Sequence, residues 1–461
     1  MRRYLLSLLV LLTFSFQLSA QVFPANPTYD KIAEEVLKDT GVPSASVAVV
    51  RDGKVVYLQA YGLANIDQKM PAKPFMRYSV GSISKQFTAA AILLLQQQGK
   101  LSLDDKVSKW IPGLTDGDKV TIRELLSHTS GYQDYWPQDY VMPEMLQPTD
   151  AQKILEKWAK IPLDFAPGTK WQYSNTNYVI AGLIVQKASG KPLLDFLEEH
   201  IFVPLGMKSV TNTDQQKLPP SDPTGYMRYA LGPLHPAPKE GKGWMFAAGE
   251  LAMTAEDLAK WDISMINQTV LSPASYKQME TEVLLANGAG SRYGLGVFVS
   301  LRRGHRLISH DGEVSGFVSA DDVFPDDHDA VVVLTNQDAI GAASQIAEKI
   351  GDSFFVPEGG ASAKANDLSK QVFDSLQQGK IDRALFTDNC NAYFDETALR
   401  DYASSLGQLG QVDEFQLVGE SLRGGMVHRS YQVKLDRGAV DINSFWMPDG
   451  KIEQFIVAPH E

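Results

Sequence analysis

The stretch Gly81-Ser82-Ile83-Ser84-Lys85 opens an apolar segment that continues to Gly99. Apolar side chains such as Phe87 and Leu94 recur in it at helical spacing, and glycine commonly ends a helix. The sequence therefore predicts a helix from Ile83 to Gly99 that is mostly buried in the interior. Ser82 then lies at its amino-terminal end, and the three-residue spacing places the Ser82 hydroxyl and the Lys85 amine on one face.

This pair of side chains can support nucleophilic chemistry. A serine hydroxyl is a weak nucleophile until a base removes its proton, and a lysine shielded from water can act as that base because burial lowers its pKa. The helix start also offers a backbone N–H to a developing oxyanion. A Ser-x-x-Lys match arises about once or twice by chance in a chain of this length, and a capping serine with a solvated lysine has the same pattern. Further elements must decide between these interpretations.

The second element is Tyr173-Ser174-Asn175, which lies in a loop just before an apolar helix. The Tyr173 hydroxyl could shuttle a proton between a nucleophile and a leaving group, and Asn175 could hold a substrate amide. Taken alone, the triplet is also typical of a buried tyrosine followed by a helix-capping asparagine.

The third element is His310-Asp311-Gly312, which we expect at the end of a strand over 306–310. Side chains alternate along a strand, and a glycine allows a substrate backbone to approach closely. A single histidine is more often structural, so this element also gains meaning only from the other two.

In this order and spacing, the three elements resemble the active-site signature of the serine β-lactamase and penicillin-binding superfamily. Within it, the sequence is most similar to class C β-lactamases and to the related DD-peptidases, D-aminopeptidases and esterases. The resemblance covers about residues 26–355 and includes the stretches 98–105, 126–131 and 249–257.

The resemblance implies roles for individual residues. Ser82 would be the acylating nucleophile, Lys85 and Tyr173 the shared acid/base groups in an order that stays open, and Asn175 a contact of substrate and lysine. The family's Lys-Thr-Gly strand triad would correspond to His310-Asp311-Gly312, with His310 facing Tyr173. The backbone N–H groups of Ser82 and Glu313 would bind the oxyanion. The resemblance implies no cofactor, and the sequence has no metal-ligand motif, so we expect neither cofactor nor metal.

His310 and Asp311 depart from the β-lactamase pattern. An imidazole stands in place of a permanently charged lysine, and an aspartate in place of the threonine that would help to hold a substrate carboxylate. Strand alternation should point Asp311 away from His310, yet its charge disfavours an anion nearby. We therefore expect hydrolysis to persist and efficient β-lactam turnover to be lost.

The surrounding patterns predict an α+β fold, an antiparallel sheet flanked by helices with a helical insert. Strands are expected over 46–51 and 54–59, joined by an Asp52-Gly53 turn, and again between 295 and 336, with a mostly helical stretch from about 100 to 290 between them. The resemblance implies a β-lactamase/transpeptidase-like domain over 26–355. Four aromatic residues that follow Gly131, namely Tyr132, Tyr135, Trp136 and Tyr140, could line the pocket or cover the core.

A Pro- and Gly-containing linker over 356–365 separates this domain from an accessory domain over 366–461. Two helical patterns followed by four strands with Gly-containing turns give the tail a small α+β fold, which resembles the NTF2-like domains appended to some serine hydrolases. Such a domain could gate the site, bind a ligand, mediate a homodimer or only stabilise the chain.

Residues 1–20 have the charged, apolar and small-residue regions of a secretory signal peptide, which predicts a periplasmic or secreted protein without a membrane span in the mature chain. The single cysteine, Cys390, cannot form an internal disulfide. A formal charge of -12 argues against nucleic acid and anionic membranes as partners, which leaves a small molecule or peptide as substrate.

The prediction is an exported serine hydrolase that cleaves an ester or an amide, such as a D-amino-acid peptide, through an acyl-enzyme on Ser82. The alternative is a penicillin-binding or sensor protein that acylates without turnover.

Overall fold

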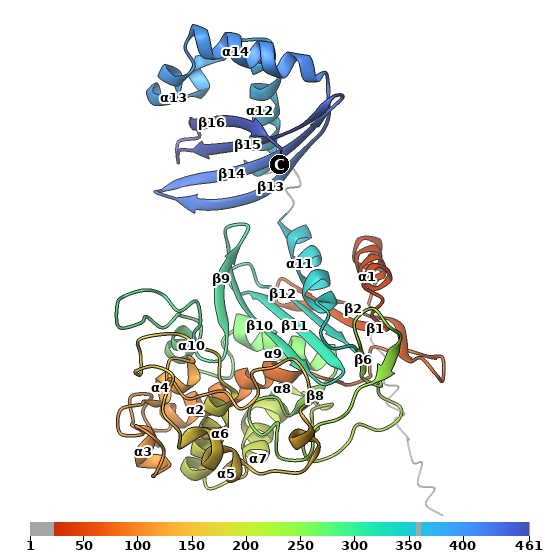
Figure 1. The fold of residues 1–461 in the computed structure, drawn as a ribbon, viewed down its shortest axis with the longest axis vertical. Coiled ribbons are helices and arrows are strands. Elements are labelled where there is room, and N and C mark those ends of the chain that lie inside the picture. Colours follow the sequence, from red (N-terminus) through yellow and green to blue (C-terminus); the bar gives the residue numbers. More distant parts are fainter. Residues whose placement is uncertain (1–22, 356–360, 461) are drawn as a thin grey trace, which may run out of the picture.

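The computed structural model describes residues 23–355 and 361–460 (Figure 1). The predicted signal peptide lies outside this part of the chain. Among the described residues, no helix combines the length and the apolar content that a membrane span requires.

A seven-stranded sheet forms the centre of the larger domain, in the order β3-β2-β1-β12-β11-β10-β9, and the pairs between its strands are antiparallel. Its strands are β1 (Ser44–Arg51), β2 (Lys54–Asn65), β3 (Met70–Pro71), β9 (Phe298–Arg302), β10 (His305–Val314), β11 (Phe317–Phe324) and β12 (Asp329–Thr335). Because β1 pairs with β12, strands from the two ends of the domain meet in the middle of the sheet. The predicted α+β architecture is confirmed.

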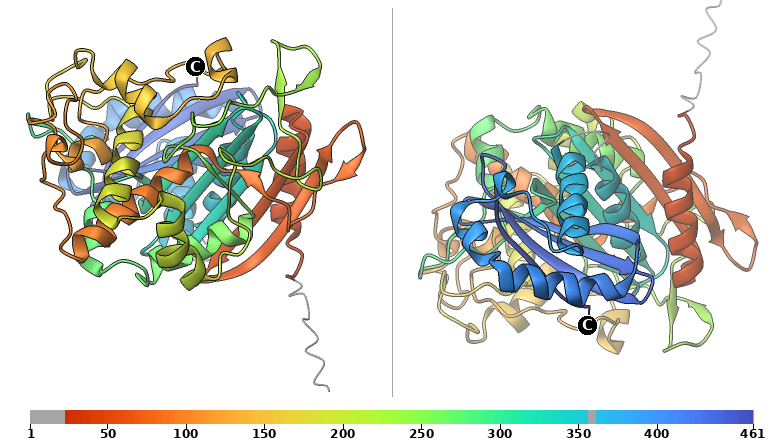
Figure 2. Two further views of the ribbon diagram at one scale, coloured as in Figure 1. Left: turned by 90° about the horizontal axis from the view of Figure 1, so that it is seen from below. Right: turned by 90° about the horizontal axis from the view of Figure 1, so that it is seen from above.

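Helices cover both faces of this sheet (Figures 1 and 2). Helices α1 (Pro27–Thr40) and α11 (Ala342–Phe354) pack on one face, and α2 (Ser84–Gln97) and α9 (Ala255–Ile266) pack on the other. Alternate residues of β1 belong to the two cores, as expected for a strand that is buried on both sides. Helix α2 therefore lies in the interior, as its apolar sequence predicts.

The helical insert surrounds α2 with short elements and loops. Its helical segments are η1 (Gly81–Ile83), α3 (Val107–Trp110), α4 (Ile122–Leu126), η2 (Pro143–Leu146), α5 (Ala151–Ile154), η3 (Leu155–Ala159), α6 (Asn175–Ser189), α7 (Leu193–Leu197), η4 (Glu198–Phe202), α8 (Val203–Leu205) and α10 (Pro273–Met279). Strands β4 (Tyr78–Ser79), β8 (Leu251–Met253) and β5 (Thr211–Asn212) form a small sheet, and β6 (Tyr226–Arg228) pairs with β7 (Leu234–Pro236).

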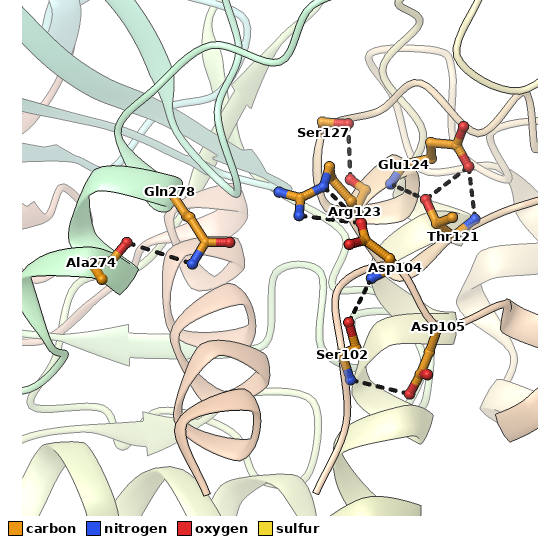
Figure 3. Close-up of polar contacts among 9 residues, drawn as sticks. All are labelled: Ser102, Asp104, Asp105, Thr121, Arg123, Glu124, Ser127, Ala274 and Gln278. Carbon is orange, nitrogen blue, oxygen red and sulfur yellow. Dashed lines mark hydrogen bonds and ion pairs between the residues drawn. The ribbon is translucent and has the colours of Figure 1, made fainter. Parts of the chain in front are cut away.

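The start of α4 is fixed by a capping box (Figure 3). The Thr121 hydroxyl accepts the Glu124 backbone N–H at 3.2 Å, and the Glu124 carboxylate accepts the Thr121 backbone N–H at 2.7 Å. Arg123 also donates to Asp104 at 3.2 Å. The contact between Arg123 and Asp104 ties the 102–105 loop to α4, whose C-terminal end continues into the loop that carries His128.

The C-terminal part forms an additional sheet domain with its own apolar core. A four-stranded antiparallel meander, β13 (Val412–Arg423), β14 (Met426–Leu435), β15 (Gly438–Trp446) and β16 (Ile452–Pro459), carries α12 (Ala361–Leu376), η5 (Arg383–Leu385), α13 (Asp388–Tyr393), α14 (Glu396–Leu406) and η6 (Gly407–Leu409) (Figure 1). Helix α12 already begins at Ala361, inside the stretch predicted as linker. The NTF2-like resemblance and the homodimer stay predictions.

Two buried carboxyl groups face each other between the sheet and α9. They belong to Asp262 on α9 and Asp321 on β11. Asp321 accepts a hydrogen bond of 2.7 Å from the Gln86 amide, whose oxygen accepts the Trp261 indole N–H at 2.8 Å. Burial raises the pKa of both carboxyl groups. The Asp321 charge raises the pKa of Asp262 further, whereas the hydrogen bond with Asp262 offsets part of the rise at Asp321. The pair therefore retains a proton at a pH where exposed carboxyl groups are ionised.

This pair predicts a pH-dependent change in stability for Asp321→Asn. The pKa of Asp321 is higher in the folded protein than in the unfolded chain, where it is near 3.8. Its contribution to stability is therefore fully present below pH 3.8 and is lost as the pH rises through the pKa of the folded state. Asparagine cannot ionise, and it can still accept from Gln86. We expect urea unfolding to show Asp321→Asn about 1–3 kcal/mol more stable than the wild type at pH 8.5, with a smaller difference at pH 5.5. An equal difference at both pH values would contradict the shared proton.

Candidate active site

Ser82 and Lys85 meet at the start of α2. Ser82 lies on the single turn η1, and Lys85 lies in the first turn of α2, where it is fully buried. The Lys85 ammonium donates to the Ser82 hydroxyl oxygen at 2.8 Å. The three-residue spacing therefore brings the two groups together as predicted.

Lys85 has two further acceptors, the Asn175 side-chain oxygen and the Ala248 backbone carbonyl, each at 2.8 Å. Burial lowers the pKa of Lys85 to about 7, although the Asp134 carboxylate acts in the opposite direction. An ammonium has three donors and uses all of them here. A neutral amine keeps two donors for Asn175 and Ala248 and turns its lone pair to the Ser82 hydroxyl. Both protonation states of Lys85 thus fit the same geometry.

Tyr173 and Asn175 arrive from the loop that leads into α6. Asn175 is the first residue of that helix, and the Lys85 amine lies 5.0 Å from the centre of the Tyr173 ring. Burial raises the pKa of the Tyr173 hydroxyl, and hydrogen bonding with Ser82 offsets only part of this effect. Tyr173 therefore keeps its proton at neutral pH.

His128 holds the Tyr173 segment in place. Its buried ring accepts the Ser174 backbone N–H at 3.2 Å through Nδ1, and its carbonyl accepts the Gln172 backbone N–H at 3.0 Å. The ring centre lies 4.3 Å from that of Tyr173. His128 thus orients Tyr173 through the segment around it and through ring packing, and not through a contact with Ser82.

The strand that carries His310 differs from the prediction. We expected the strand to end at His310, but β10 continues to Val314, so His310 lies within it. Gly312 lines the cavity, so its contact with a substrate backbone stays a prediction, and the structure adds a second reason for a glycine. A Cβ at this position would lie 1.9 Å from the Val80 carbonyl oxygen, so the glycine lets β10 pass against the segment that leads into Ser82.

The His310 ring lies beside that of Tyr173, but its polar partners are other groups. Its ring centre lies 6.2 Å from that of Tyr173, but its Nε2 is 2.8 Å from the Tyr293 hydroxyl and its Nδ1 is 2.6 Å from the Asp311 carbonyl oxygen. Because a carbonyl only accepts, Nδ1 carries the proton and Nε2 accepts from Tyr293. Burial lowers the pKa of His310 to about 3, with the Lys85 charge acting the same way. His310 is therefore neutral, with both nitrogens used inside the protein.

Glu313 brings its backbone close to Ser82. The place that a Cβ of Gly81 would occupy lies 2.7 Å from the Glu313 backbone nitrogen, and Gly81 has a φ of +52°. The two predicted oxyanion donors thus come from adjacent segments. The Glu313 side chain is exposed and accepts the Ala339 backbone N–H at 2.8 Å, so its backbone rather than its carboxylate lies next to Ser82.

These residues open into a cavity of about 890 Å³. Among the residues that the structure describes, its lining includes no lysine or arginine but five acidic residues, Asp134, Asp139, Asp311, Glu313 and Asp338. Of the predicted aromatic residues, Tyr135, Trp136 and Tyr140 contribute to the lining, whereas Tyr132 is buried and donates to the Thr115 carbonyl. The cavity is therefore acidic with partly aromatic walls.

Three contacts in the site were missed by the sequence analysis, those made by Asp134, Ala248 and Tyr293. Asp134 accepts the Asn175 backbone N–H at 3.0 Å and the Asn175 side-chain amide at 3.2 Å. The sequence feature that could have indicated Asp134 is its position as a single acidic residue within the aromatic cluster after Gly131. Nothing local marked Ala248, which acts through its carbonyl, or Tyr293.

Known proteins are similar to this chain in sequence and in fold. The Penicillin-binding protein 4* of Bacillus subtilis (strain 168) is 28% identical over 387 residues, which are 79% of this chain and 84% of that protein. A D-stereospecific amidohydrolase from Streptomyces sp. is 28% identical with a TM-score of 0.62, over 70% of this chain and 98% of its own. An octameric penicillin-binding protein homologue from Pyrococcus abyssi, 22% identical, shares the fold with a TM-score of 0.62 over 94% of this chain and 96% of its own.

The likeness to the Pyrococcus abyssi protein spans more of this chain than the larger domain alone, so the shared fold includes the C-terminal sheet domain. A family model described as Beta-lactamase matches residues 29–352, most of the chain and the whole of the site. The chain therefore belongs to the beta-lactamase family of serine hydrolases.

Proposed function

We propose that the enzyme hydrolyses an amide or ester that lacks a carboxylate next to the scissile bond, such as the amide of a D-amino acid, through an acyl-enzyme on Ser82. The observation that carries this proposal is the 2.8 Å contact between Lys85 and Ser82 at the base of an acidic cavity. The contact joins a nucleophile to its base, and the acidic cavity disfavours anions.

In the acylation step, the Ser82 oxygen attacks the substrate carbonyl carbon while its proton passes to the neutral Lys85 amine. The new C–O bond gives a tetrahedral oxyanion, for which the backbone N–H groups of Ser82 and Glu313 are the donors. No side chain has to move for the proton transfer, because Lys85 keeps its contacts with Asn175 and Ala248 in both protonation states.

Collapse of this intermediate breaks the bond to the leaving group, which must take up a proton. Tyr173 is a protonated phenol beside Ser82 and can donate it, and Lys85 then returns its proton to Tyr173. A water molecule next attacks the Ser82 ester and loses a proton to the same groups. The acid product leaves as the Ser82 oxygen takes back a proton, which restores its hydroxyl.

The charges in the cavity select the substrate. A carboxylate near the scissile bond would face five acidic residues with no lysine or arginine in the described lining, and His310 cannot help because it is neutral with both nitrogens bonded. Bringing like charges together costs several kcal/mol. A neutral or cationic substrate avoids this cost, and the likeness to a D-stereospecific amidohydrolase supports an amide of a D-amino acid.

Initial rates on matched substrates test this selection. We expect p-nitrophenyl butyrate and a D-amino-acid amide to be turned over. A D-Ala-D-Ala peptide should react at least about 100-fold more slowly in kcat/KM than the same peptide with an amidated C-terminus, because only the carboxylate differs. Nitrocefin should be similarly poor.

Comparable rates on the acid and amide forms of the peptide would contradict the substrate proposal. One equivalent of acyl adduct with no turnover on any substrate would instead support the alternative, a penicillin-binding or sensor protein.

The exported location is proposed on residues 1–20, whose pattern is that of a signal peptide. The domain boundaries proposed from the sequence are 26–355 for the hydrolase domain and 366–461 for the accessory domain.

A further inference from the structure

Asp134 has more contacts with the site than the proposed reaction uses. One of its oxygens accepts three N–H groups, from the Trp136 backbone at 3.1 Å, the Asn175 backbone at 3.0 Å and the Asn175 side chain at 3.2 Å. The other oxygen lies 3.3 Å from the same Asn175 amide nitrogen. Asp134 therefore determines which way the Asn175 amide points.

The orientation of Asn175 matters because its two ends differ. With its nitrogen turned to Asp134, its oxygen accepts the Lys85 ammonium at 2.8 Å. A flipped amide would present N–H donors to Lys85, which as an ammonium is itself a donor. Asp134 thus excludes the orientation that would repel Lys85.

The other groups that face Lys85 do not carry a negative charge. Its hydrogen-bond partners are the Ser82 hydroxyl, the Ala248 carbonyl and the Asn175 amide. The rings nearby are those of Tyr173 before α6, Tyr178 on α6, His128 from the loop after α4, and His310 from β10. Both histidines are neutral, since burial lowers the pKa of each. Asp134 is the carboxylate that acts on Lys85, and it works against the effect of burial on the pKa of that lysine.

We propose that Asp134 is a positioning residue of the acylation step, which fixes the Asn175 amide and supplies the counter-charge of Lys85. This inference rests on the proposed function, in which Lys85 takes the proton of Ser82. Removing the charge of Asp134 should therefore change the pH at which Lys85 loses its proton. It should also weaken the contact by which Asn175 holds Lys85.

The test is the rate at which a fluorophosphonate phosphonylates the Ser82 oxygen with loss of fluoride, followed by intact mass as a function of pH. In the wild type the rate should rise with pH through the titration of Lys85, because only the neutral amine is a base. Asp134→Asn removes the carboxylate that stabilises the ammonium, so the rise should shift to lower pH. The maximal rate should fall by up to about 100-fold, because the Asn175 amide is no longer held in one orientation.

Asp150→Asn is the matched control. Asp150 is also a carboxylate that accepts a backbone N–H, from Lys153 at 2.9 Å, but it caps α5 outside the cavity. Its variant should keep the wild-type profile. In an Asn175→Ala background, Asp134→Asn should lower the maximal rate no further, because its effect on that rate passes through Asn175.

A wild-type profile for folded Asp134→Asn would overturn the inference and leave the proposed function standing. If the wild-type protein itself forms no Ser82 adduct, the proposed function fails instead. Should Asp134→Asn not fold, Asp134→Ser takes its place, because a serine hydroxyl removes the charge and can still accept an N–H. An unshifted profile for that variant would equally overturn the inference.

Discussion

Ser82→Ala should abolish covalent labelling by a fluorophosphonate and lower hydrolysis of p-nitrophenyl butyrate by about 10⁴-fold or more. Alanine removes the Ser82 oxygen that forms the acyl bond, while Lys85 keeps its contacts with Asn175 and Ala248. The fold should therefore survive the change. Intact mass before and after labelling measures the adduct, and initial rates measure the hydrolysis.

Ser344→Ala is the control for this experiment, because Ser344 is a second serine on the wall of the cavity, where its hydroxyl makes only a 3.5 Å contact with Asp311. This variant should label and turn over like the wild type. An adduct that persists in Ser82→Ala would place the nucleophile elsewhere and refute the acyl-enzyme on Ser82.

The sequence predicted the parts of the site that depend on local spacing. Ser82 and Lys85 are three residues apart on a helical start, so their contact follows from helix geometry. The main-sheet hairpin at Asp52-Gly53 and the glycine turns of the C-terminal sheet follow from turn chemistry in the same way.

The contacts that the sequence did not predict join distant segments. Asp134 bonds to Asn175 across 41 residues, Tyr293 to His310 across 17, and Ala248 to Lys85 across 163. None of these pairs is set by the period of one helix or strand. Their partners are chosen by how loops fold over the sheet, which no local pattern records.

The strand that contains His310 shows a different kind of error. A glycine in a strand is compatible with a strand end, with a close substrate and with a close contact inside the protein. The first two were expected at Gly312. The strand end is wrong, the close substrate stays a prediction, and the structure shows the third, because Val80 occupies the space that a side chain would need. Only the three-dimensional structure distinguishes these reasons.

Gly312→Ala should disturb the oxyanion site, because β10 passes so close to the Val80 segment at this position. The new methyl group would lie 1.9 Å from the Val80 carbonyl oxygen and 2.5 Å from the Ser319 hydroxyl, so β10 and the segment before Ser82 must separate. The Ser82 and Glu313 backbone donors lie on these two segments, so the separation also pulls the oxyanion site apart. We expect kcat/KM for p-nitrophenyl butyrate to fall by about 100-fold or more, because a 1 Å misplacement can cost that much.

Overpacking should also cost about 1–3 kcal/mol of stability, so thermal unfolding has to be measured beside the rate. Gly419→Ala is the matched control, since Gly419 is a strand glycine of β13 whose added Cβ meets nothing closer than 3.9 Å, and it should change neither quantity. Loss of stability with unchanged kcat/KM in Gly312→Ala would assign Gly312 to packing alone. Loss of rate in a folded protein would link the close approach of β10 to the geometry of acylation.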